Sequence, residues 1–186
     1  MHCGRVHSTR RRRLPVGWIA CALLCASAGA LQAQPVLEYE VKAAFLLNFA
    51  KFVDWPPSAF AAADSPIAIC ILGEDPFGHA IDDVVQGESV NGRKVIVRRI
   101  NQTPAAQTCQ ILFSAETGRN VRAILESLGP GVLTVGDGDE FVRQGGMIGF
   151  QLENRHVRFD INQRAAELGN VKISSRLLAV ARAVEK

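Results

Sequence analysis

The sequence predicts a single α/β domain: a mostly parallel central sheet with helices on both faces, then a C-terminal antiparallel hairpin and a final helix. Two observations lead to this fold class. Apolar segments of strand length alternate with helical segments from residue 66 to residue 144, a pattern typical of parallel strands joined by helices. Between residues 147 and 161, polar and apolar residues alternate with a period of two, as in two half-buried strands.

The first predicted element is an amphipathic helix from Glu38 to Trp55. Its apolar side chains gather on one broad face, and we expect Lys42 and Lys51 to lie outside that face. The Trp-Pro-Pro sequence at its end stops the helix, because a residue before proline is pushed out of the helical region.

Strands and helices are then predicted to alternate. The run PIAICIL at 66–72 is apolar throughout, so we expect a strand that is covered on both faces. The other predicted strands are 94–100, 109–113 and 132–135, and the helices are 79–86, 120–128 and 139–144. Turns that contain glycine separate most of these segments.

The C-terminal part begins with the hairpin, whose arms we place at 147–152 and 157–161 around a turn at 153–154. A short helical stretch at 165–168 is expected to stop at a Gly-Asn pair. The last helix follows, with Ser174 and Ser175 as candidate N-caps. Its apolar stripe is predicted to run from Leu177 to Val184.

Residues 1–33 have the order of segments that a secretory signal peptide shows. A basic start without acidic residues precedes an apolar run from Leu14 to Ala30, and small residues then allow cleavage after Ala30 or Ala33. This order favours a cleaved leader over an uncleaved anchor or a lipoprotein. We therefore expect a leader at 1–33, one domain at 34–186, and a periplasmic location.

The leader also explains the basic balance of the chain. It holds five of the 21 Lys and Arg residues and none of the 18 Asp and Glu residues, so the remainder carries a net charge of about −2. The basic balance of the full chain is therefore no indication of nucleic-acid binding.

Two cysteines, Cys70 and Cys109, lie outside the leader. An even pair in an oxidising compartment favours a disulfide over the alternative of two buried free thiols. Such a bond would close a loop of roughly 40 residues and contribute about 4 kcal/mol in the chain-entropy model.

No catalytic constellation is visible, and we expect no enzyme activity, metal or cofactor. The only histidines after the leader are His79 and His156, and neither belongs to a zinc-binding or nucleophile motif. The segment GDGDE at 136–140 lacks the last glycine of a phosphate-binding loop and carries acids that would repel phosphate. A weak ligand-site candidate is Gly73, Glu74 and His79, because ligands bind beyond the carboxyl ends of parallel strands.

Several segments together resemble the YfiR family of periplasmic proteins: EYEVKAAFLLNFAKFVDWP, PIAICILGEDPFG, CQILF and the stretch from GGMIGFQLENRHVRFDINQ to LLAVARAV. The resemblance covers nearly all of residues 36–184. It implies an α/β protein that represses an inner-membrane diguanylate cyclase by binding its periplasmic sensor domain, which lowers cyclic-di-GMP signalling and biofilm formation. It also implies a homodimer, sequestration by an outer-membrane lipoprotein, and sensitivity to redox state. Cys70 and Cys109 match the more widespread cysteine pair of the family, whereas Gly149 and its neighbours do not supply a second pair.

A partner-binding protein is the leading hypothesis. Leu168, Val171 and Ile173 bracket the turn at 169–170 and are candidate apolar anchors for a partner. The alternative for each of them is packing of the last helix onto the sheet. A second hypothesis for the function is a periplasmic small-ligand sensor, or an adaptor for a different membrane receptor or histidine kinase.

Overall fold

The structure, a computed structural model, describes residues 33–186, with side chains from Leu37 onward. Apart from Ala33, the predicted leader lies outside the described residues. Among the described helices, none has the length and apolar character that crossing a membrane requires.

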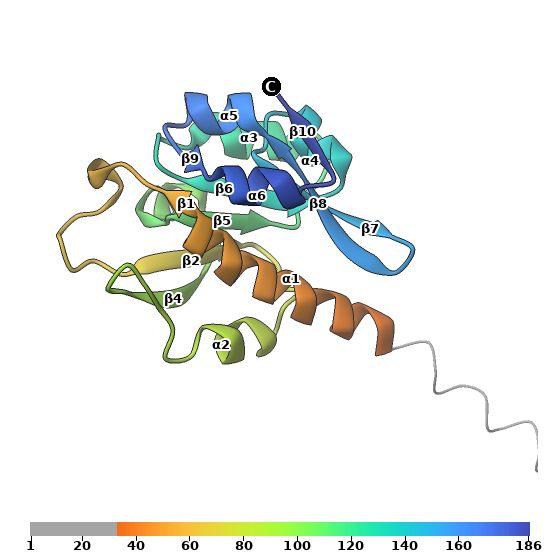
Figure 1. The fold of residues 1–186 in the computed structure, drawn as a ribbon, viewed down its shortest axis with the longest axis horizontal. Coiled ribbons are helices and arrows are strands. Elements are labelled where there is room, and N and C mark those ends of the chain that lie inside the picture. The colour runs from red at the N-terminus through yellow and green to blue at the C-terminus, as the bar shows by residue number, and fades with distance from the viewer. Residues whose placement is uncertain (1–32) are drawn as a thin grey trace, which may run out of the picture. The chain divides into compact units, whose positions relative to one another are not determined.

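Within the described residues, eight strands form one sheet in the order β10-β8-β7-β6-β5-β2-β4-β3 (Figure 1). The strands are β2 (Ile67–Leu72), β3 (Ser89–Val90), β4 (Arg93–Ile100), β5 (Ile111–Ser114), β6 (Leu133–Asp137), β7 (Ile148–Glu153), β8 (His156–Asn162) and β10 (Ala183–Glu185). Neighbours from β4 to β7 are parallel, while β7 and β8 form an antiparallel hairpin. The predicted fold class is confirmed.

Helices cover both faces of this sheet. The helices are α1 (Ala33–Phe52), α2 (Ala80–Val85), α3 (Arg119–Ser127), α4 (Asp139–Arg143), α5 (Gln163–Leu168) and α6 (Ser175–Val180), with 3-10 turns η2 (Pro57–Ala59) and η3 (Thr103–Thr108). In Figure 1, α1 and α6 cross in front of the sheet.

Strand β2 shows why both faces are covered. Its odd-numbered residues, such as Ile69, pack into the large core with α1 and α2. Its even-numbered residues, such as Cys70, pack into a second cluster that α3 and η3 cover. All six residues of β2 are buried, as the uninterrupted apolar run predicts.

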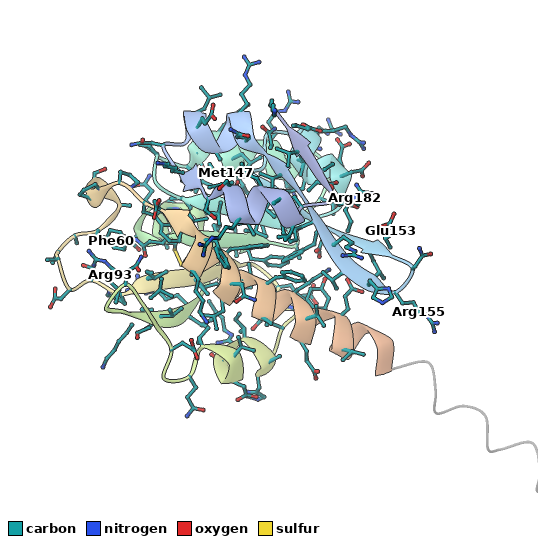
Figure 2. All side chains as sticks on the ribbon, in the orientation of Figure 1. Phe60, Arg93, Met147, Glu153, Arg155 and Arg182 are labelled. Carbon is teal, nitrogen blue, oxygen red and sulfur yellow. A yellow bond between two sulfur atoms is a disulfide. The ribbon has the colours of Figure 1, made fainter. Side chains whose placement is uncertain are left out.

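The hairpin loop lies one residue later than expected. Asn154 and Arg155 form it, with φ values of 50° and 64°. Positive φ at both loop residues is typical of a two-residue type I′ turn, which matches the twist of the two strands. Figure 2 labels Glu153 and Arg155 at this tip.

The first helix ends earlier than predicted. α1 ends at Phe52, and the next two residues form a short strand, β1 (Val53–Asp54), that pairs antiparallel with β9 (Lys172–Ile173). The side chain of Trp55 lies beyond the helix, where its Nε1–H donates a hydrogen bond to the carbonyl of Gln110 at 3.0 Å. A tertiary pairing therefore ends the helix before the prolines do.

The last helix also ends earlier than predicted. Ser174 is its N-cap, since its Oγ accepts a hydrogen bond from the backbone N–H of Leu177 at 3.3 Å. The helix ends at Val180, and Val184 belongs to β10, parallel to β8. Arg182 (Figure 2) explains the change. Its backbone N–H donates to the carbonyl of Phe159, and its guanidinium donates to the buried carboxylate of Asp160.

Candidate partner-binding surface

The three predicted anchors do not share one surface. Leu168 is the last residue of α5 and is 79% exposed, the largest fraction among the bulky hydrophobic residues that the structure describes. Val171 is 2% exposed and belongs to the large core. Ile173 is half-buried in β9 opposite Val53. Val171 therefore packs in the core, as the alternative proposed, and its expected role as a partner anchor is corrected. Leu168 remains the exposed candidate.

Leu168 stands beside an apolar groove of about 550 Å³ that runs between the end of α3 and α5. Its apolar lining comes from three parts of the chain: Leu125, Leu128, Pro130, Val132, Met147, Ala165 and Leu168. Arg164 is the charged residue in the lining. An exposed leucine next to an apolar groove is more informative than a single exposed leucine, which is common on protein surfaces.

Hydrogen bonds at both ends of α5 hold the walls of this groove in place. The side chain of Asn162 caps α5 by accepting a hydrogen bond from Ala165 N–H at 2.8 Å. Gly169 ends the helix, and a side chain there would collide with the terminal methyl group of Met147. The carbonyl of Gly169 accepts a hydrogen bond from Gly131 N–H at 2.7 Å. Met147 (Figure 2) lines the groove, and its terminal methyl group occupies the space beside Gly169.

The other exposed bulky apolar residues lie elsewhere. Leu37 and Val41 are on α1, Leu152 is on the hairpin, and Val180, 64% exposed, ends α6. None of these four lines the groove beside Leu168. Val180 is therefore a matched control for Leu168, because both end a short helix with an exposed side chain.

The three predicted ligand-site residues are only partly brought together. Gly73 follows β2 with φ +78° and lines a separate cleft with Glu116 and Asn120. Glu74 and His79 are exposed and do not line that cleft. Of the three, Gly73 alone lines the cleft, and Glu116, which the sequence did not suggest, reaches it from the loop after β5.

The segment that follows Gly73 is held by an arginine of β4. Arg99 pairs with Asp75 at 2.7 Å and with Asp82 at 2.6 Å. The hydrogen bonds from Arg99 lower the pKa of Asp82 below its ordinary value. This network fixes the connection between β2 and α2 against the sheet edge.

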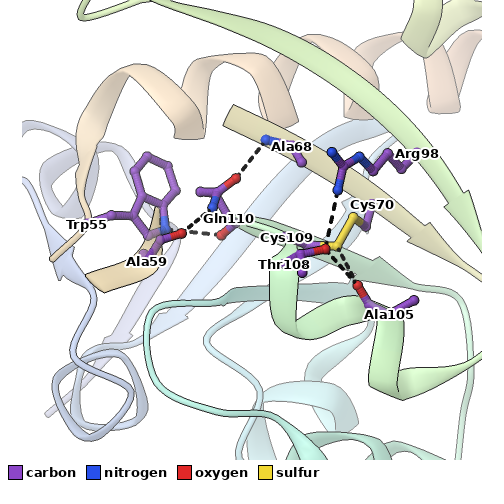
Figure 3. Close-up of a disulfide and its surroundings, with 9 residues drawn as sticks. All are labelled: Trp55, Ala59, Ala68, Cys70, Arg98, Ala105, Thr108, Cys109 and Gln110. Atoms are coloured by element: carbon purple, nitrogen blue, oxygen red, sulfur yellow. Dashed lines mark hydrogen bonds between the residues drawn. A yellow bond between two sulfur atoms is a disulfide. The ribbon is translucent and has the colours of Figure 1, made fainter. Parts of the chain in front are cut away.

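Cys70 and Cys109 form a disulfide, with their Cα atoms 6.0 Å apart (Figure 3). Both are at most 1% exposed. The bond joins the middle of β2 to the residue that follows η3. Beside it, the buried side chain of Gln110 accepts from Ala68 N–H at 2.8 Å and donates to the carbonyl of Ala59 at 2.6 Å.

A buried ion cluster between α1 and β6 was missed by the sequence reasoning. Lys42, expected outside the apolar face, is 4% exposed, and its Nζ lies 2.7 Å from Asp137 and 2.5 Å from Glu38. The Tyr39 hydroxyl donates to the other Asp137 oxygen at 2.9 Å. Burial, with the neighbouring Asp137 carboxylate, raises the pKa of Tyr39. Among the described residues, no group of three or more His, Cys, Asp or Glu side chains is arranged to hold a metal ion.

The sequence profile of the YfiR/HmsC-like family matches residues 39–182. The chain belongs to the YfiR/HmsC-like family. The match includes α1 from Tyr39, both cysteines of the disulfide, and the whole groove beside Leu168. Membership in the YfiR/HmsC-like family indicates a regulatory protein rather than a catalyst, and it agrees with a periplasmic location.

Solved structures resemble this YfiR/HmsC-like chain only distantly. A conserved domain protein from Vibrio cholerae is 10% identical with a TM-score of 0.48. The ABC domain in complex with L-Trp from Streptococcus pneumonia is 9% identical with a TM-score of 0.46. Each match covers 79% of this chain and 60% of the solved chain, so this chain spans less than two thirds of either, and neither match informs on function. No curated protein matches the chain significantly.

Proposed function

We propose that this protein is a periplasmic regulator that binds the periplasmic sensor domain of an inner-membrane diguanylate cyclase and inhibits the enzyme, which lowers cyclic-di-GMP signalling. The observation that carries the proposal is the family match over residues 39–182. The predicted leader at residues 1–33 agrees with export to the compartment in which such a sensor domain lies.

The contact surface that we propose is the groove with Leu168 on its edge. Burying a leucine side chain that is largely exposed in the free protein contributes about 2 kcal/mol, and a few such anchors carry most of the energy of an interface. In return, an apolar side chain from the cyclase would contact Leu125, Leu128 and Met147 in the groove beside Leu168. Arg164 on the lining would select an acidic neighbour on the partner.

Two further partners belong to the same proposal. An outer-membrane lipoprotein would sequester the regulator, and a second copy of the chain would form a homodimer. Competition between the lipoprotein and the cyclase for the Leu168 surface would release the cyclase from inhibition, since one surface cannot hold both at once.

The alternative function is a small-ligand sensor or an adaptor for a different membrane receptor or histidine kinase. The specific observation in its favour is the cleft beyond β2, which Gly73 lines together with Glu116. A regulator that acts by contact alone should inhibit the cyclase equally with and without a ligand in this cleft, whereas in a sensor the bound ligand should change the inhibition.

The test is inhibition of a membrane-bound diguanylate cyclase from the same organism, chosen first from the genes beside this one. Cyclase activity is measured in membranes with increasing amounts of wild-type protein, Leu168→Asp or Val180→Asp. We expect wild type and Val180→Asp to inhibit equally, and Leu168→Asp to require at least about tenfold more protein. Equal inhibition by all three proteins would remove Leu168 from the contact surface, and no inhibition by wild type of any such cyclase would remove the proposed function.

A further inference from the structure

The cleft beyond β2 lies where the chain changes direction in the sheet. β2 has β4 on one side and β5 on the other, and all three strands are parallel. After β2 the chain passes to α2, which packs on the large-core face, whereas after β5 it passes to α3, whose Ile124 packs on the opposite face. Such a reversal opens a crevice beyond the carboxyl ends of the two strands, which is where open α/β sheets bind ligands.

The cleft at this position has a volume of about 550 Å³, within the usual range for small-molecule sites. Leu72 and Ile124 contribute apolar surface, and both belong to or pack against the second core cluster. Thr103 lines the wall that η3 provides. That wall is tied to β2 at its far end, because Cys109 directly follows η3 and is bonded to Cys70 (Figure 3).

Glu116 supplies the charge of the cleft. Its backbone N–H donates to Ser114 Oγ at 3.2 Å, and one carboxylate oxygen accepts from the side chain of Asn120 at 3.1 Å. The other oxygen, Oε1, faces Gly73, where it lies 3.6 Å from the place that a Cβ atom would take. Glycine at 73 therefore leaves space in front of this oxygen.

Among the described residues that line the cleft, Glu116 is the one charged side chain, and no lysine, arginine or histidine accompanies it. An anionic ligand would meet a carboxylate and no cation, so its binding is disfavoured. A ligand with one positive charge would find a carboxylate partner next to apolar surface, and a hydrogen bond to a charged group is the stronger kind.

We propose that this cleft binds a small molecule that carries one protonated amine beside an apolar body. The amine donates to Glu116 Oε1 in front of Gly73, and the apolar body lies against Leu72 and Ile124. The site is distinct from the groove beside Leu168, and it does not depend on the identity of the protein partner.

The test uses three ligands of one shape: 2-phenylethylamine, 2-phenylethanol and 3-phenylpropanoate. Each is titrated into the protein, purified after export by its own leader, while backbone amide shifts are followed by NMR. For a ligand of this size we expect a dissociation constant on the order of 1 mM for the amine. The alcohol should bind about threefold more weakly, because it lacks the charge pair with Glu116, which is exposed and therefore contributes less than about 1 kcal/mol, and the carboxylate should show no saturable shifts.

Two variants complete the test. Glu116→Gln should weaken the amine about threefold, to the level of the alcohol, and leave the alcohol unchanged. Glu126→Gln removes an exposed carboxylate of α3, the helix that follows Glu116, at a position outside the cleft, and should change nothing. Saturating amine shifts at Gly73 and Asn120 that depend on Glu116 support the proposal. Absence of saturable amine binding, equal binding of amine and carboxylate, or an unchanged amine affinity in Glu116→Gln would overturn it.

Discussion

Removing the disulfide should cost this domain about 4 kcal/mol of stability. The bond links residues 39 positions apart. In the chain-entropy model, a loop of that length restricts the unfolded chain enough to contribute about 4 kcal/mol at 25 °C. Both sulfur atoms are buried between β2 and η3, so the double variant Cys70→Ala/Cys109→Ala also loses packing contacts that the reduced wild type keeps.

The assay is urea unfolding of three forms: oxidised wild type, reduced wild type and the double variant. Linear extrapolation gives the free energy of unfolding of each form in water. We expect reduced wild type to lose about 4 kcal/mol, with a fall of about 10 °C in Tm for a domain of this size. The double variant should lose somewhat more, because two buried sulfur atoms are missing as well.

The reasoning would be refuted if both the reduced protein and the double variant lost less than about 1 kcal/mol. That result would mean that the segment between the two cysteines is already restricted in the unfolded state. The bond would then add little to the entropy difference between the two states.

Three further predictions concern single residues. Lys42→Met should lower the free energy of unfolding by about 3 kcal/mol, because it leaves the half-buried carboxylate of Asp137 without its cation. Lys51→Met, which removes a pair with 41% exposed side chains, should cost less than about 1 kcal/mol; equal losses in urea unfolding would contradict this. Gly149→Ala should cost about 1–3 kcal/mol by overpacking, because its Cβ would lie 2.7 Å from a backbone carbonyl oxygen, and an unchanged Tm would be the opposing result. Because folding lowers the pKa of Asp82, its ionised carboxylate stabilises the folded state fully above the pKa of the unfolded chain, and this stabilisation is lost as pH falls through the pKa in the folded protein. Asp82→Asn should therefore lose less stability than wild type below about pH 4. Parallel wild-type and variant stability curves from pH 3 to pH 6 would count against it.

The elements that could be predicted are those that local sequence determines. The apolar run at 66–72 becomes a strand buried on both faces because every one of its residues is apolar. The hairpin follows from the period-two alternation between residues 147 and 161, and its arms pair in register from Ile148 to Ile161. The N-cap at Ser174 is a local hydrogen bond, so the sequence alone could indicate it.

The features that could not be predicted depend on distant partners. Lys42 can be buried because the carboxylate of Asp137, far away in the sequence, accepts a hydrogen bond from its ammonium group and balances its charge. Val184 leaves the helical pattern because Asp160 holds Arg182 beside β8. Val171 is buried where β9, the strand that follows it, pairs with β1. Each of these strands has two residues, which is too short for the sequence to predict the pairing. Of the predicted surface residues, only the exposure of Leu168 agrees with the anchor that the sequence suggested.

The central claim, that this protein works by contact through the groove beside Leu168, is tested most directly by measuring binding to the purified periplasmic domain of the neighbouring cyclase. Calorimetric titration compares wild type with Leu168→Asp and Val180→Asp, two exposed positions that should tolerate the change. The account predicts that wild type and Val180→Asp bind with the same affinity, and that Leu168→Asp binds at least about tenfold more weakly. Identical affinities for wild type and Leu168→Asp, or no complex with wild type, would contradict it.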